Sequence, residues 1–127
     1  MKRLNASRPQ LLVCGKYLTG DKRLNRLLTK KYDLYIINQV QDLEKIVTQK
    51  TINLILIDVL KNRKKKLKTI KQLKRMIPDI LIVVVNSSQN VRTAAEILTS
   101  GATDVFPMPY DSELLADRVD GLLKNVC

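Results

Sequence analysis

The chain has 127 residues, of which 45% are apolar and 28% charged, so it is long enough for one domain with its own core and has an ordinary globular composition. It contains no apolar run near the roughly 18 residues of a membrane span, no signal-peptide pattern, and no histidine or Cys-x-x-Cys pair for zinc. Its net charge of +11 is the unusual quantity, and it raises the question of a polyanionic partner.

The two cysteines do not form the pattern of a disulfide framework. Cys14 lies in a predicted core strand and Cys127 is the last residue of the chain. A protein with this cysteine usage is typical of a reducing compartment, so we expect a cytoplasmic location.

Short apolar runs alternate with amphipathic segments along the chain. The predicted strands cover residues 10–14, 33–37, 51–58, 80–85 and 104–106. The predicted helices lie after them: one capped by Thr19 or Asp21 and ending at residues 30–31, one over residues 41–50, one with apolar positions from Leu67 to Ile77, one between Asn90 and Gly101, and one beginning at Asp111 or Ser112. Five such βα units predict a three-layer α/β fold. We interpret residues 1–127 as a single domain, with residues 1–9 as a flexible N-terminal extension.

The segment 51–58 is the centre of this pattern. It is rich in Leu and Ile, apolar on both faces, and it ends at Asp58. Parallel strands with two apolar faces are buried in the middle of a sheet, and their carboxyl ends form the crevice where open α/β folds place their ligands. Asp58 is therefore the first candidate site residue.

The end of the chain resembles a known family. Residues 101–114 read GATDVFPMPYDSEL, which is similar to the closing segment of bacterial response-regulator receiver domains (the CheY-like family), typically G-A-D-D-[YF]-[LI]-x-K-P-[FY]-x-x-x-E-L. Together with the strand ending in Asp58 and the order of five βα units, the resemblance extends over essentially the whole chain. It implies the flavodoxin-like doubly wound parallel sheet, with strand order 2-1-3-4-5.

The resemblance also implies a phosphoryl site, which this sequence keeps only in part. Asp58 matches the aspartate that accepts a phosphoryl group. Gly15 and Lys16 stand where two acids would help to hold Mg²⁺, and no acid occurs before Asp21 in any register. Asn86, followed by Ser87 and Ser88, stands at the Ser/Thr position, and Met108 replaces the lysine.

These changes favour a degenerate receiver, a pseudo-receiver that works by protein–protein interaction without phosphorylation. Asp58 alone is a poor Mg²⁺ site, so no cofactor is expected. We further predict that the Lys16 ammonium pairs with Asp58 where the metal would lie; the alternative is that Lys16 points into solvent. Met108 is interpreted as an apolar cover of the crevice. A phospho-acceptor that uses Asp58 with weakened Mg²⁺ chemistry stays open as an alternative.

A basic segment follows the strand that ends at Asp58. It contains nine cations between Lys61 and Arg75, which the apolar spacing of Leu67, Ile70 and Leu73 predicts to lie on the outer face of a helix. A contact patch there would comprise Lys64, Lys65, Lys68, Lys71 and Arg75. A nucleic-acid-binding module is thus an alternative of another class, but no aromatic residues interleave with the cations, and a solvated helix face is favoured over it.

The resemblance implies a signalling domain of a two-component (phosphorelay) system rather than an enzyme. The expected partner is a protein, either a sensor kinase or an output domain. Members of the family commonly dimerise or bind partners through the fourth helix, fifth strand and fifth helix, so a homodimer through that face is a further expectation, and no membrane contact is expected.

Overall fold

The structure is a computed structural model, and it describes residues 8–87 and 90–124. Its five described strands form one parallel sheet in the order β3-β2-β4-β5-β6. Their bounds are Gln10–Cys14 for β2, Asp33–Ile37 for β3, Leu54–Asp58 for β4, Leu81–Asn86 for β5 and Asp104–Pro107 for β6. Counted along the chain this is the order 2-1-3-4-5, so the predicted flavodoxin-like fold is confirmed.

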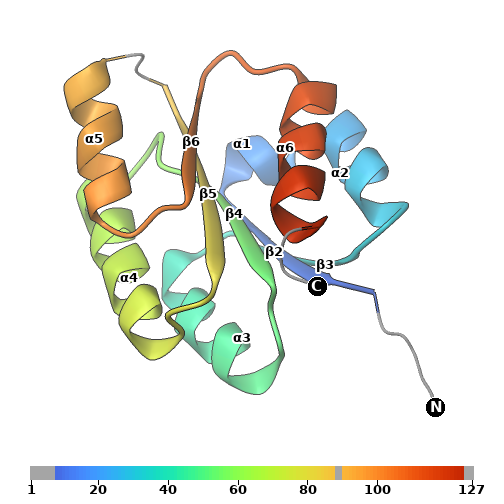
Figure 1. Cartoon of the computed structure of the whole chain (residues 1–127), viewed down its shortest axis with the longest axis horizontal. Coiled ribbons are helices and arrows are strands. Elements are labelled where there is room, and N and C mark those ends of the chain that lie inside the picture. Colours follow the sequence, from blue (N-terminus) through green and yellow to red (C-terminus); the bar gives the residue numbers. More distant parts are fainter. Residues whose placement is uncertain (1–7, 88–89, 125–127) are drawn as a thin grey trace.

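The helices connect successive strands and cover both faces of the sheet (Figure 1). Their bounds are Lys16–Thr19 for α1, Lys22–Thr29 for α2, Leu43–Gln49 for α3, Arg63–Met76 for α4, Val91–Thr99 for α5 and Ser112–Lys124 for α6, with a 3₁₀ turn, η1, at Val40–Asp42. The short helix α1 was not predicted from the sequence. No helix of the described part of the chain is long and apolar enough to cross a membrane.

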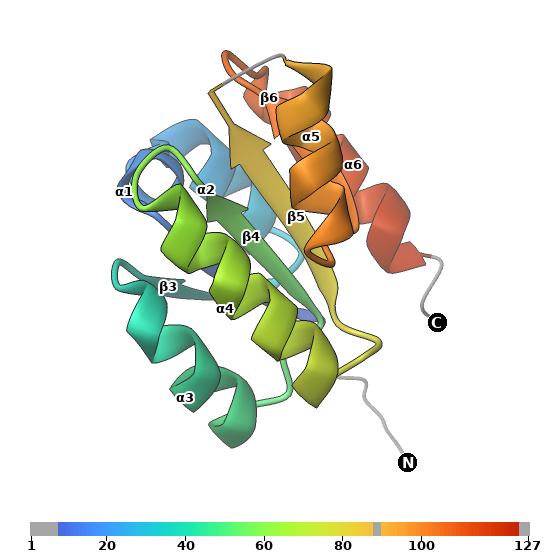
Figure 2. The same ribbon diagram turned by 90° about the vertical axis from the view of Figure 1, so that its left-hand side faces the viewer.

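Two separate cores hold the three layers together, one on each face of the sheet. Because successive strand residues point to opposite faces, Ile55 and Ile57 pack under α3, α4 and α5, whereas Leu54 and Leu56 pack under α1, α2 and α6. Figure 2 shows α3, α4 and α5 together on the first of these faces. All five residues of β4 are buried, which confirms its central position.

Two predicted boundaries near β4 were wrong. The strand begins at Leu54 rather than at residue 51, because Asn53 turns its side chain to accept a hydrogen bond from the Gln10 backbone N–H at 2.8 Å. Helix α4 begins at Arg63 instead of after Lys66. The second shift matters for the site, since it places Lys66 in the first helical turn beside the end of β4.

The described end of the N-terminal segment is attached to the fold. Residues 1–7 of the expected extension lie outside the described residues. The Arg8 guanidinium donates to the Tyr32 carbonyl at 2.9 Å, and the Pro9 carbonyl accepts from the Asp33 N–H at 3.0 Å. Within the expected extension, residues 8–9 are therefore hydrogen-bonded to β3 and the residue before it.

Asp21 fastens the start of α2 to the loop before α6. Its carboxylate accepts from the Leu24 N–H at 3.0 Å, the Tyr110 hydroxyl at 2.7 Å and the Ser112 hydroxyl at 3.0 Å. Burial raises the pKa of Asp21. The hydrogen bonds to its charged form together lower the pKa by more than burial raises it, so the net pKa lies below the ordinary 3.8. Asp21 is thus the helix cap that the sequence offered beside Thr19.

Replacing Asp21 by asparagine keeps the cap but removes the charge. Because the folded-state pKa of Asp21 is lowered, its charge-dependent stabilisation is present above pH 3.8 and is lost as the pH falls through the folded-state pKa. We expect Asp21→Asn to be less stable than the unmodified protein by about 1 kcal/mol at pH 7, with the gap closing as the pH falls below 3.8 and through the lowered folded-state pKa. Urea unfolding at several pH values measures this gap, and a gap of constant size at every pH would contradict the prediction.

Candidate site at the carboxyl edge of the sheet

Asp58 ends β4 at the carboxyl edge of the sheet, as predicted. It pairs in register with Val85 of β5, and the residue is only 3% exposed. Its Oδ2 atom lies 3.4 Å from the backbone N–H of Leu18 in α1. A carboxylate buried to this extent requires a positive or hydrogen-bonding partner, because desolvation disfavours an isolated charge.

That partner is Lys66, from the first turn of α4. Its Nζ atom donates to the Asp58 carbonyl oxygen at 2.8 Å and lies 3.5 Å from Asp58 Oδ1, and the residue is 7% exposed. Helical side chains tilt toward the helix N-terminus, so a lysine one turn inside α4 reaches back to the end of the preceding strand. The pair is a buried ion pair between two adjacent elements.

The predicted Lys16–Asp58 ion pair was wrong. Lys16 is exposed at the start of α1, and among the ion pairs of the described residues Asp58 is joined to Lys66. The idea of a lysine beside the aspartate was correct, but the lysine comes from a different element.

Gly15 lies against the Asp58 carboxylate. Its φ of +114° is a conformation that residues with a side chain rarely adopt, and a Cβ atom there would lie 2.2 Å from Asp58 Oδ2. The backbone at this position therefore leaves no room for the aspartate or glutamate that the family resemblance implies.

The preceding residue, Cys14, is fully buried with a free thiol. Burial raises the pKa of Cys14 to about 11; Lys66 opposes this rise and Asp58 adds to it. The thiol is therefore neutral at pH 7, and a neutral buried thiol is a poor nucleophile and a poor metal ligand.

The other predicted pocket residues lie at the ends of β5 and β6. Asn86 is the last residue of β5 and is buried, and its carbonyl accepts from the Met108 N–H at 2.8 Å. Ser87 is exposed, and Ser88 lies outside the described residues. Met108 is half-buried and packs against the core between the sheet and α6. The peptide bond from Met108 to Pro109 is cis.

A cavity of about 520 Å³ opens beside Asp58, on the side of β3. Its wall combines the turn after β2, the loop between β3 and η1, and the loop that leads into α4. Among the described residues of this wall Asp58 is the one carboxylate, whereas four are lysines: Lys16, Lys61, Lys65 and Lys66. Asn86 and Met108 do not line it.

These residues do not fit Mg²⁺, the metal implied by the receiver resemblance. Mg²⁺ takes an octahedral set of oxygen ligands, usually with one or two carboxylates. Asp58 already holds Lys66, and the described residues contain no group of three Asp, Glu, His or Cys side chains that could hold a metal. The four lysines would also repel a cation.

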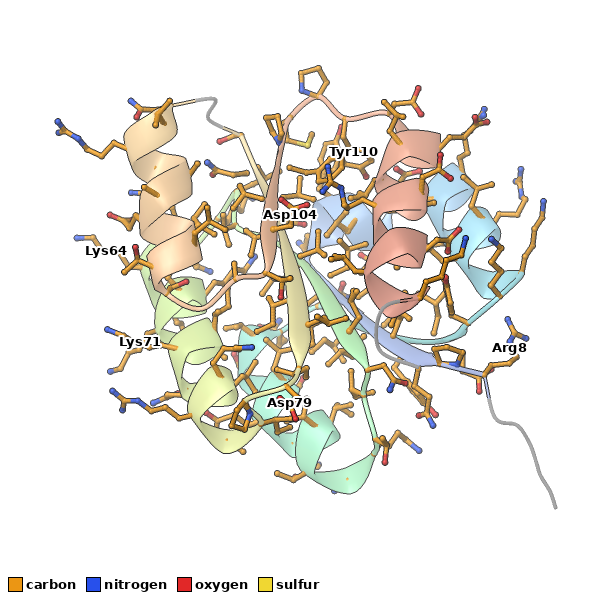
Figure 3. All side chains as sticks on the ribbon, viewed as in Figure 1. Arg8, Lys64, Lys71, Asp79, Asp104 and Tyr110 are labelled. Carbon is orange, nitrogen blue, oxygen red and sulfur yellow. The ribbon has the colours of Figure 1, made fainter. Side chains whose placement is uncertain are left out.

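The predicted basic patch is exposed on α4, and one of its members, Lys65, also lines the cavity. Lys64, Lys65, Lys68, Lys71 and Arg75 are all exposed, and Figure 3 shows Lys64 and Lys71 pointing away from the ribbon. The prediction that every cation of the segment faces outward was wrong for Lys66.

Two more cations of the segment have structural contacts. Arg63 lies 3.5 Å from Glu96 of α5, and Lys74 donates to the carbonyls of Pro78 and Ile80 at 2.7 and 3.0 Å. These contacts hold the two ends of α4 to its neighbours, so part of the basic segment stabilises the fold.

The sequence contained a signal for Lys66 that its interpretation missed. Position 66 precedes Ile70 by four residues and Leu73 by seven, so it lies on the apolar stripe of α4. A lysine on a core-facing stripe requires a buried acid within reach, and Asp58 is the nearest one along the chain.

The parallel sheet in the order 2-1-3-4-5 is flavodoxin-like, and a buried aspartate ends its central strand. The sequence matches no family model. Over 78 residues it is 35% identical to the transcriptional regulatory protein ZraR from Klebsiella oxytoca, a match that covers 61% of this chain and 17% of that regulator. The chain thus corresponds to a small part of the length of this relative.

Solved structures agree on the fold. The receiver domain of the Francisella response regulator 1452 superposes with a TM-score of 0.82, at 17% identity, over 94% of this chain and 99% of that one. A protein assigned to pilus assembly (cpaE) from Burkholderia thailandensis superposes with a TM-score of 0.77, at 19% identity, over 91% of this chain and 98% of that one. The chain therefore has the receiver fold, and the fold also occurs in a protein with a different assignment.

Proposed function

We propose that this chain is a receiver-like signalling domain of a two-component system that acts through protein contacts, without phosphorylation of Asp58. The observation that carries the proposal is the buried pair of Asp58 with Lys66. The lysine provides inside the fold the positive charge that a metal would bring from solution. The site is then fixed in one electrostatic state and needs no cofactor.

Access to Asp58 supports the same conclusion. The carboxylate is buried against Gly15, the Leu18 N–H and Lys66. A phosphoryl donor would have to displace Lys66 and bring its own negative charge next to the carboxylate without a metal, which is electrostatically unfavourable. At the family's lysine position, Met108 provides no positive charge for the product.

Restoring the metal site would require more than a change of side chain. The Cβ atom of an acid at position 15 would clash with the Asp58 carboxylate, and the positive φ of Gly15 would strain the backbone of that acid. The loss of the metal site therefore involves the backbone beside β4 as well as the side chains. A receiver that lost one metal ligand through a single substitution would not differ in its backbone.

The face formed by α5, β6 and α6 is the proposed partner surface. It exposes three large apolar side chains, Val91 at 83%, Leu98 at 47% and Leu114 at 62%. Exposed apolar residues on these elements favour a protein partner, either a kinase, an output domain or a second copy of the chain.

The function is tested by incubating the protein with Mg²⁺ and acetyl phosphate and measuring its intact mass. We expect no phosphoryl adduct, while a receiver with its acidic pair, treated in parallel, is modified. An adduct that disappears in Asp58→Asn would support the alternative, a phospho-acceptor with weakened Mg²⁺ chemistry. Sedimentation velocity of the untreated protein and of Leu114→Glu then shows whether the apolar face pairs two copies.

A further inference from the structure

The cavity beside Asp58 has an excess of positive charge that the ion pair leaves uncompensated. Lys66 neutralises Asp58, so the positive charges of Lys16, Lys61 and Lys65 remain without a counter-charge in the cavity. All three are exposed, and within the described part of the chain none of them forms an ion pair. Three ammonium groups around one cavity repel each other unless an anion lies between them.

The rest of the wall contains hydrogen-bond donors. Four residues with side-chain amides line the cavity: Asn38, Gln39, Gln41 and Asn62. The Asn38 Oδ1 atom accepts from the Thr19 hydroxyl at 3.2 Å, which leaves its NH₂ group to donate. Helix α4 begins at this wall with no acid in its first turn and no side chain capping its N–H groups. Its positive end therefore adds to the field of the lysines.

The cavity also has an apolar side. Tyr17, Val40 and Leu60 line it, and the Tyr17 ring is held edge-on to Tyr110 with 6.0 Å between centroids. Tyr17 is 49% exposed, so a large part of its surface is free for contact. A volume of about 520 Å³ lies in the range of small-molecule sites.

We propose that this cavity binds a phosphorylated small molecule of nucleotide size, with the phosphates on Lys16, Lys61 and Lys65 and the organic part against Tyr17. Lysine is a common phosphate-binding residue because its ammonium group is a compact charge with three donors. The site lies where the receiver resemblance implies a cation, but its residues are arranged for an anion. A bound ligand would bridge the turn after β2, the loop after β3 and the start of α4. The state of the signalling domain would then depend on the concentration of this ligand.

Isothermal titration calorimetry tests the proposal with ATP, tripolyphosphate, AMP and adenosine, in a buffer with EDTA. We expect binding that weakens from ATP and tripolyphosphate to AMP, with none for adenosine. The variant Lys16→Ala/Lys61→Ala/Lys65→Ala should lose affinity about tenfold or more. The matched control Lys64→Ala/Lys68→Ala/Lys71→Ala removes the same charge from the outer side of α4, outside the cavity, and should change affinity less than about twofold.

Two outcomes would overturn the proposal: no heat of binding for any phosphorylated probe at millimolar concentration, or an equal loss in both triple variants, which would show nonspecific attraction to a basic protein. Stronger binding of tripolyphosphate than of ATP would reject the role of Tyr17, and equal binding of adenosine would reject the role of the phosphates. The measurement involves neither Mg²⁺ nor phosphoryl transfer. Its result is therefore independent of whether Asp58 accepts a phosphoryl group.

Discussion

Replacement of Lys66 by methionine is expected to destabilise the protein by about 3 kcal/mol, because it leaves the Asp58 carboxylate buried without its charge partner. Asp58 is 3% exposed, so little water reaches the carboxylate in the folded protein. A domain of this size has a free energy of unfolding of about 5–15 kcal/mol, and the loss is a large share of it. Urea denaturation of both proteins measures the difference.

A double-mutant cycle separates the loss of the ion pair from the loss of packing. In Asp58→Asn/Lys66→Met both charges are absent, and we expect a stability within about 1 kcal/mol of the unmodified protein. Lys65→Met is the matched control, since Lys65 precedes Lys66 on the same helix but is exposed; its effect should stay within about 0.5 kcal/mol. If the single Lys66→Met change were as mild as Lys65→Met, the buried pair would not be a stabilising contact of the site.

Replacement of Gly15 by alanine is the second change with a large expected effect, a loss of about 3 kcal/mol. The new Cβ atom would lie 2.2 Å from Asp58 Oδ2, and the backbone φ of +114° is strained for any residue with a side chain. Both costs act at the same point, between the turn after β2 and the end of β4. Thermal and urea unfolding of Gly15→Ala measure the loss.

Gly121 provides the control for this substitution. It lies inside α6, and a Cβ atom added there meets nothing within 4 Å. Gly121→Ala should therefore stabilise the protein by about 0.5–1 kcal/mol through the higher helix propensity of alanine. In Gly15→Ala/Asp58→Ala the clashing carboxylate is gone, so the cost of the Gly15 change should fall to the backbone strain alone. An unchanged cost in that background would show that the Asp58 contact is not its cause.

The local pattern of apolar and polar residues was sufficient to predict the fold. The runs around Leu12, Ile55 and Val84 are apolar at successive positions, which requires strands buried on both faces, and their regular alternation with amphipathic segments leaves few topologies open. The errors occurred at boundaries, where a single contact decides. Asn53 leaves the predicted strand for a hydrogen bond to Gln10, and α4 begins four residues earlier than its first obvious apolar position, Leu67.

The sequence by itself determined that Asp58 ends a central strand, and that no acid near Gly15 and no lysine at Met108 accompanies it, because these are facts of residue type and order. Only the tertiary structure decided which cation meets Asp58. Lys16 follows the end of β2 and Lys66 lies eight residues after Asp58, and which of them pairs with Asp58 depends on where α4 begins and on the direction of its side chains. The surplus of lysines in the cavity is likewise a result of the tertiary structure, since Lys16 comes from the start of α1, whereas Lys61 and Lys65 come from the segment that leads into α4.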